Sequence, residues 1–152
     1  MTLGFQFKET MTGTYHLLAS PLDERAITFT IGAKVDGIRK FVKDKLATIE
    51  GEVDVEGFAD KQPLKGTLGL KLLDERRLPY EFTFKGNDDR DYRFRGQKDF
   101  TVIAVTQSMT VLPASLYDAT GAEIGRATLR FDMSHDFRTF AQSWKLRYWG
   151  WR

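Results

Sequence analysis

The sequence predicts an all-β fold, an antiparallel β-barrel or a two-sheet β-sandwich, with about eight to ten strands and two short helices. Three observations predict it. Residues 80–100 read as two alternating strands around a polar turn, most other segments place apolar side chains at every second residue, and helical spacing occurs in only two short stretches. No linker or change of composition divides the chain, so we expect a single β domain over residues 1–152.

The segment 80–100 predicts a β-hairpin. Its turn, residues 86–91, is rich in Gly, Asn and Asp, which tolerate tight backbone conformations and cap their own turns. A side-chain period of two separates an apolar face from a charged face on both strands. The aromatic residues expected to point inward are Tyr80, Phe82, Phe84, Tyr92 and Phe94.

Alternation also predicts strands nearer the N-terminus. One covers residues 5–15, and a second covers 26–35 after a turn signal at 20–23. The period then changes, because apolar residues at i, i+3 and i+4 within 36–43 suit a short helix with Asp36 as its N-cap.

Two further strands are predicted over residues 46–58 and 63–72. The first presents an acidic row on its polar face, and the second presents lysines on its polar face. Such rows fit neighbouring antiparallel strands that form solvated ion pairs. The residues of these rows are Glu50, Glu52, Asp54 and Glu56 on the first strand, and Lys65 and Lys71 on the second.

The remaining segments follow the same pattern, with one helical exception near the C-terminus. They are a strand over 101–105, a strand over 109–117, a turn at 118–121, a strand around 127–131, a helical stretch that begins at Ser134, and a last strand over 145–151.

A faint internal repeat has an offset of about one hundred residues. Each copy reads strand, turn, strand, short helix, strand, so a real repeat implies a pseudo-twofold β architecture. Chance alignment of short alternating segments is the alternative. The matched pairs are Phe29 with Leu129, Ile31 with Phe131, Asp36 with Asp136, and Leu46 with Leu146.

Composition limits the classes of function. Hydrophobic residues at 41% and charged residues at 29% are ordinary for a soluble globular protein, and no apolar run approaches the roughly 20 residues of a membrane span. The N-terminus lacks the pattern of a secretory signal, so we expect a cytoplasmic protein. The chain has no cysteine, which excludes disulfides and thiolate metal sites. A formal charge of +2 is too small to predict nucleic-acid binding.

Four segments together resemble a known family: FQFKETMTG, VDGIRKFVKDKLATIEGEV, LPYEFTFKGNDDRDYRFRGQKDF and LYDATGAEIGRATLRFDMSHDFRTFAQSWKL. In this order they resemble the β-rich accessory region of cholesterol-oxidase-like members of the glucose-methanol-choline flavoprotein family. The flavin-binding core of that family is absent, because the chain has no Gly-rich dinucleotide-binding motif and no room for that core. The resemblance implies a relative of an accessory module associated with lipid and sterol chemistry, and it carries over no catalytic residue.

Glu9 is the residue whose type conflicts most with its position. Because every second side chain of a strand points to the same side, Glu9 lies on the same strand face as Phe7, Met11 and Tyr15. A buried carboxylate should find a cation, a hydroxyl or a bound ligand. We therefore expect either a polar anchor in a ligand cavity, or a carboxylate held by a neighbouring Arg or Tyr or lying near a barrel rim.

Catalytic and metal sites are not indicated. Ser134, His135 and Asp136 are the residue types of a hydrolase triad, but adjacent residues cannot form that relay, and helix capping explains them better. His16, the other histidine, is distant in sequence from them. We predict no structural metal and no cofactor.

The C-terminus alternates aromatic and basic residues. Trp149 and Trp151 share the outward face of the last predicted strand and would form an exposed apolar patch. Such a patch suits contact with another subunit or domain better than contact with single-stranded nucleic acid or a membrane surface.

Two functions from different classes follow. The first is a non-enzymatic module with an apolar core or cleft that binds a lipid-like or sterol-like small molecule, although the same residues could form a solid core. The second is a protein-interaction or oligomerisation domain that docks on an enzyme partner or a second copy through its edge strand and the tryptophan patch. A small isomerase acting through Glu9 requires an open pocket and a second titratable group. The candidate ligand-binding residues are Phe7, Glu9, Met11, Tyr15, Phe29, Tyr80, Phe82 and Tyr92.

Overall fold

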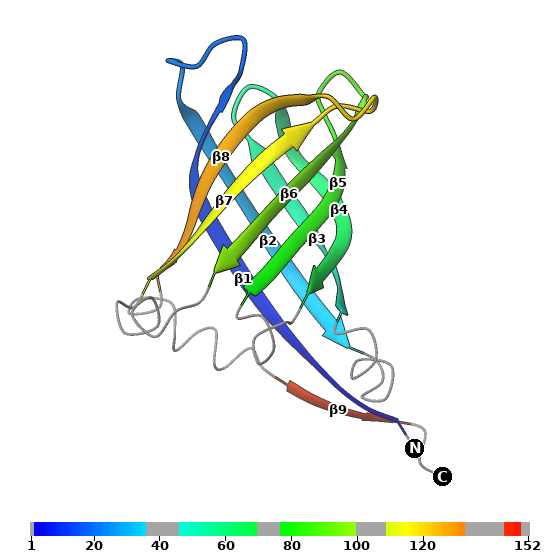
Figure 1. The fold of residues 1–152 in the computed structure, drawn as a ribbon. Coiled ribbons are helices and arrows are strands. Elements are labelled where there is room, and N and C mark those ends of the chain that lie inside the picture. The colour runs from blue at the N-terminus through cyan, green and yellow to red at the C-terminus, as the bar shows by residue number, and fades with distance from the viewer. Residues whose placement is uncertain (1, 36–45, 70–76, 100–108, 133–144, 150–152) are drawn as a thin grey trace.

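The computed structural model describes residues 2–35, 46–69, 77–99, 109–132 and 145–149, all of them in strands and the turns between them (Figure 1). The strands are β1 (Thr2–Leu17), β2 (Arg25–Val35), β3 (Leu46–Val55), β4 (Ala59–Gly69), β5 (Arg77–Lys85), β6 (Asp91–Asp99), β7 (Met109–Tyr117), β8 (Glu123–Asp132) and β9 (Lys145–Trp149).

The first eight strands form a closed antiparallel barrel. Each pairs with the next along the chain, and β1 pairs with both β2 and β8, so the sheet has no free edge between them. The predicted all-β class is therefore confirmed, and of the two predicted architectures the barrel is the one observed. The helices expected over 36–43 and from Ser134, and the strand expected over 101–105, lie outside the described residues.

The long strand β1 makes this closure possible. Residues 5–15 pair with β2 along one edge, and residues 12–17 pair with β8 along the other. Residues 2–4 extend beyond the pairing with β2, and residues 2–6 pair with β9, which lies next to the N-terminus (Figure 1). One strand therefore joins the barrel to a two-stranded extension.

Most of the buried side chains that the structure describes are apolar, as the alternation predicts. Phe82 is 1% exposed, and Phe94 and Leu129 are fully buried. Burying side chains of this size contributes about 1.5–3 kcal/mol each to the folded state. The largest fully buried side chains come from seven of the strands: Met11, Ile27, Phe29, Ile31, Ile49, Leu64, Leu68, Tyr80, Phe82, Phe94 and Leu112.

Aromatic rings fill the middle of the barrel. Phe82 of β5 and Phe94 of β6 stack with their ring centroids 4.5 Å apart. Phe29 approaches them from β2 in edge-on geometry, with centroid distances of 5.3 Å to Phe82 and 5.4 Å to Phe94. Because β2 and β6 lie on opposite walls, this aromatic cluster spans the interior as a packed core.

The described residues of the predicted charge rows lie on the outer surface, whereas Lys71 is outside the described residues. Glu50 of β3 stands directly opposite Lys65 of β4, as expected for neighbouring antiparallel strands. Glu52, Asp54 and Glu56 are exposed on the same side. The rows thus mark the outside of the barrel.

Two glycines allow neighbouring strands to approach closely. A Cβ atom on Gly13 would lie 1.9 Å from the main-chain oxygen of Thr128 in β8, and one on Gly66 would lie 1.8 Å from that of Glu81 in β5. Gly13 pairs with β2 and β8 at once, so the barrel closes through a position where only glycine fits.

The strands matched by the internal repeat have different pairing partners. At an offset of about one hundred residues, β2 and β3 correspond to β8 and β9. However, β3 pairs with β2, whereas β9 pairs with β1. The repeat does not extend to the strand pairing.

Candidate functional site

Glu9 lies inside the barrel and is hydrogen-bonded to Tyr80. Among the residues that the structure describes, it is the one charged side chain that is buried, with 7% of its surface exposed. The Tyr80 hydroxyl donates to Oε1 of Glu9 over 2.5 Å. Because β1 and β5 are separated by three strands in either direction around the barrel, this hydrogen bond joins opposite walls.

The environment fixes the protonation state of Tyr80. Burial raises the pKa of its hydroxyl well above the usual 10.0, and the neighbouring charge of Glu9 and the hydrogen bond between them raise it further. Tyr80 is therefore a protonated donor at neutral pH, and Glu9 is the acceptor. The carboxylate held by a neighbouring Tyr, one of the two sequence-based expectations, is observed.

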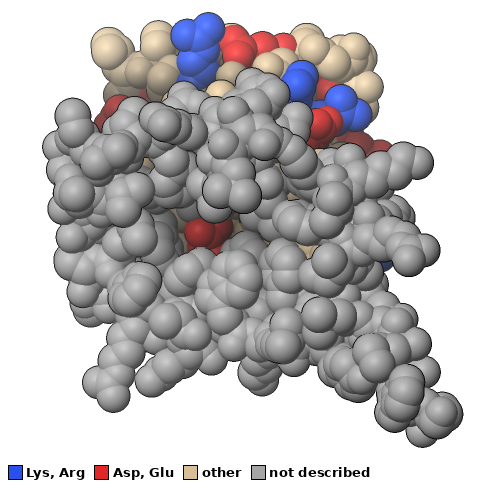
Figure 2. Space-filling view, turned by 60° about the horizontal axis from the view of Figure 1, so that its bottom comes forward, with Lys and Arg blue, Asp and Glu red and all other residues tan. Residues whose placement is uncertain are grey.

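The pair lies beside the aromatic core. The rings of Phe29 and Tyr80 have centroids 6.0 Å apart. Toward the barrel end where β2 stops and β3 starts, the buried side chains include Ala33, Val35 and Ala47, and buried Leu68 of β4 lies opposite Ala47. Figure 2 turns this end toward the viewer, and acidic side-chain atoms are visible near its middle. We call Glu9 and Tyr80, with the three small residues, the candidate site.

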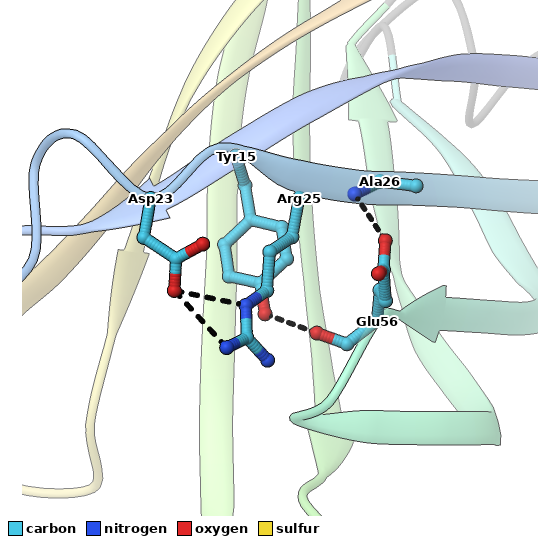
Figure 3. A network of polar contacts seen from close by, with 5 residues as sticks. All are labelled: Tyr15, Asp23, Arg25, Ala26 and Glu56. Carbon is cyan, nitrogen blue, oxygen red and sulfur yellow. Dashed lines mark hydrogen bonds and ion pairs between the residues drawn. The ribbon is translucent and has the colours of Figure 1, made fainter.

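A polar network fastens the opposite end of the barrel (Figure 3). The Tyr15 hydroxyl donates to the main-chain oxygen of Glu56 over 2.5 Å, and the Glu56 carboxylate accepts from the backbone N–H of Ala26 at 2.9 Å. Arg25 forms an ion pair with Asp23 at 3.0 Å. These contacts tie β1, β2 and the β3–β4 turn together.

Other turns at this end are also tied to one another. The backbone N–H of Asn87, in the β5–β6 turn, donates to the main-chain oxygen of Phe58, and the Asn87 side chain accepts from the N–H of Asp60. A small hollow of about 170 Å³ remains beside Tyr15 and Phe58. The turns at this end of the barrel are therefore linked to each other.

A larger groove of about 590 Å³ lies on the outer surface, between β6 and the β7–β8 turn. Arg93 and Arg95 line it, and both face Glu81, at 3.6 Å and 3.8 Å. These pairs are about half exposed and so contribute at most about 1 kcal/mol each. The two arginines are not among the site residues predicted from the sequence. The alternation along their strand, which places both on its outward face, could have identified them.

The residues predicted to bind a ligand divide into separate groups. Glu9 and Tyr80 are in direct contact, whereas Tyr15 lies in the network at the opposite end. Tyr92 donates its hydroxyl to Asp88 of the hairpin turn at 2.6 Å. Met11, Phe29 and Phe82 are packed in the core. The ligand-binding role of the whole set stays a prediction.

Several predicted residues are only partly described or not described. Phe7 lies on β1 opposite Ala33, and Trp149 lies on β9 opposite Thr2, but their side chains are not described. Trp151 and the Ser134–Asp136 segment lie outside the described residues. His16 lies opposite Arg126 on the barrel wall and is half-buried.

The described ranges contain neither a cluster of metal ligands nor a membrane-spanning helix. No three His, Asp or Glu side chains there gather as metal ligands would. Nor does any helix in those ranges have the length and apolar character to cross a bilayer.

No family model, no curated protein and no solved structure matches the chain. The resemblance to the accessory region of glucose-methanol-choline flavoproteins therefore stays a prediction.

Proposed function

We propose that this protein is a non-enzymatic module that binds one apolar small molecule, of lipid or sterol type, at the candidate site. The observation that carries the proposal is the Glu9 carboxylate inside a barrel whose other buried side chains, among the described residues, are hydrophobic. Burying such a group costs free energy, and specific recognition of a ligand is one physical reason for a fold to retain it.

The surroundings of Glu9 suit such a ligand. Ala33, Val35 and Ala47 are buried apolar side chains of the neighbouring strands, and Glu9 and Tyr80 are hydrogen-bonded polar side chains beside them. Binding pockets for small molecules combine these two features. A barrel of about eight strands has room for one small ligand.

Binding is favoured over catalysis by the raised pKa of Tyr80. A general acid works best when its pKa lies near the working pH. Burial raises the pKa of Tyr80, which is hydrogen-bonded to Glu9, well above 10.0 and thus away from neutral pH.

The test is a ligand screen on the full chain. Native mass spectrometry with sterols, fatty alcohols and fatty acids should detect one bound molecule per chain, and the same molecule should displace an apolar fluorescent probe. If no member of the panel binds with defined stoichiometry, the proposal is wrong.

The two-stranded extension favours a second candidate function, a protein-interaction module. Among the described strands, β9 pairs with β1 alone, so its other edge faces no described strand. A free edge can accept a strand from a partner or from a second copy. Trp149 belongs to this strand.

A double variant tests this second function. Trp149→Ala with Trp151→Ala should lower the sedimentation coefficient of an oligomer, or abolish capture of an enzyme partner, and should leave small-molecule binding unchanged. Unchanged sedimentation together with unchanged capture would contradict the interaction role.

A further inference from the structure

We infer that the β1–β2 turn, residues 18–24, is a docking tip that places Leu22 in an apolar pocket of a partner protein whose surface around that pocket is basic. This surface differs from the β9 edge and from the candidate site, and the inference depends on neither. Three observations support it: the exposure of Leu22, the hydrogen bonds that fix the turn, and the charge of the neighbouring turns.

Leu22 is the most exposed of the large apolar side chains that the structure describes. Its exposed fraction is 97%, whereas the others exposed in this class, Leu18, Leu46 and Val111, are between 42% and 46% exposed. Leu18 belongs to the same turn, which extends beyond the other turns at this end of the barrel (Figure 1). Single exposed leucines are common on protein surfaces, so a docking role needs further support.

A hydrogen-bonded β-turn presents Leu22. The backbone N–H of Asp23 donates to the main-chain oxygen of Ser20 at 3.0 Å, so residues 20–23 form the turn, with Pro21 and Leu22 at its centre. The proline ring fixes the backbone angle that the second position of such a turn requires. The conformation of the tip is therefore set before any partner binds.

The base of the turn is also held in place. The backbone N–H of Ser20 donates to the main-chain oxygen of Leu17 at 2.9 Å, and that of Leu18 donates to Ile124 of β8 at 2.8 Å. An apolar side chain on an ordered turn loses little backbone freedom on binding, which lowers the cost of association. The order of this turn is the property that a docking tip needs.

The turns around the tip are acidic. The four turns at this end of the barrel, residues 18–24, 56–58, 86–90 and 118–122, together carry six carboxylates and one cation, in a chain whose formal charge is +2. Arg25, at the start of β2, neutralises one of the six in an ion pair of 3.0 Å with Asp23. The tip therefore stands on an acidic surface. The six are Asp23, Glu24, Glu56, Asp88, Asp89 and Asp118, and the cation is Arg90.

Charge selects among the possible partners. An anionic membrane would repel Asp23 and Glu24, which directly follow Leu22. A second copy docked end to end would bring two acidic surfaces together. A protein with lysines and arginines around an apolar pocket matches both features, because the leucine supplies a buried anchor and the charges guide and orient the encounter.

Photo-crosslinking followed by binding measurements tests the inference on the full chain. A diazirine-bearing leucine analogue in place of Leu22, in cells of the source organism, should crosslink a protein that the same analogue in place of Val111 on the barrel wall does not. That protein, identified and purified, should bind the chain at least about threefold more weakly at high than at low salt. Crosslinks to lipid or to a second copy alone, no crosslinked protein, or salt-independent binding would overturn the inference.

A serine variant assigns the affinity to the tip. Leu22→Ser should weaken binding of the purified partner at least about tenfold, and it should leave the melting temperature unchanged because the side chain is almost fully exposed. Leu46→Ser, an exposed leucine of β3 at the other end of the barrel, is the matched control and should keep the wild-type affinity. Wild-type affinity of Leu22→Ser, or an equal loss in Leu46→Ser, would overturn the inference.

Discussion

Tyr80 and Glu9 join opposite walls of the barrel through a hydrogen bond of 2.5 Å, although they are 71 positions apart in the sequence. The bond divides the interior into two parts. On one side is the packed core around Phe29, and on the other is the end lined by Ala33 and Ala47. The stability of the fold and the proposed binding site therefore share one pair of residues.

Removing the Tyr80 hydroxyl should destabilise the protein. Tyr80→Phe leaves Oε1 of buried Glu9 without this donor, and we expect a loss of about 1–3 kcal/mol in the free energy of unfolding. Urea denaturation followed by intrinsic fluorescence measures the change. The half-buried Tyr117, changed to Phe, is the control and should change stability by no more than about 0.5 kcal/mol. Equal stability of Tyr80→Phe and the wild type would contradict this role of the bond.

Stability should fall at alkaline pH because of Tyr80. Its pKa is about 10.0 when unfolded and well above that when folded. Above pH 10 the unfolded state loses this proton while the folded state keeps it, so the free energy of unfolding decreases as pH rises, by about 1.4 kcal/mol per unit for one such group. Denaturation series between pH 9 and pH 11, a range of about two units, should show a steeper decline for the wild type than for Tyr80→Phe. Parallel profiles would contradict the assignment.

Barrel closure should depend on Gly13. Gly13→Ala would place a Cβ 1.9 Å from the main-chain oxygen of Thr128, so β1 and β8 would have to separate, at a cost of more than about 2 kcal/mol. Gly32 is the matched control, because a Cβ there would meet nothing closer than 3.9 Å and Gly32→Ala should be neutral or slightly stabilising. Thermal melts of both variants measure the difference. Similar melting temperatures would argue against the close approach at Gly13.

The aromatic cluster should dominate the stability of the core. Phe94→Ala removes a fully buried ring that stacks on Phe82, and we expect a loss of about 3–5 kcal/mol. The next residue, Arg95, points outward and makes an exposed ion pair, so Arg95→Ala should cost no more than about 1 kcal/mol. Chemical denaturation of the two variants compares them directly. A cost at Arg95 equal to that at Phe94 would contradict the assignment of faces.

Local pattern was enough to predict the strands and their inward faces. A period of two places Phe82 and Phe94 inside whatever the tertiary arrangement, and the turn residues at 86–91 position the hairpin. The choice between a barrel and a sandwich lay beyond this pattern, because both bury one face of every strand. It depends on whether β1 pairs with β8, a contact more than one hundred positions away in the chain.

The candidate site could be predicted only in part, because the sequence pattern does not give the strand order. The side-chain period of two identified Glu9 as a carboxylate on an apolar face and Tyr80 as an inward aromatic residue. Their contact follows from strand order, which brings β1 and β5 to opposite walls. The division of the other predicted residues between core, turn and opposite end also depends on strand order, since residues with the same parity can lie at different heights in a barrel.

The most direct test of the central claim, that Glu9 is the polar anchor of an internal ligand, is carbon-13 NMR of the glutamate side-chain carboxyl groups during titration with dodecanol. The Glu9 signal, assigned by its loss in Glu9→Gln, should shift and reach saturation at one dodecanol per chain, while the signals of the exposed Glu50 and Glu52 stay in place. Saturable binding that leaves the Glu9 signal unchanged, or a titration in which no carboxyl signal moves, would contradict the claim.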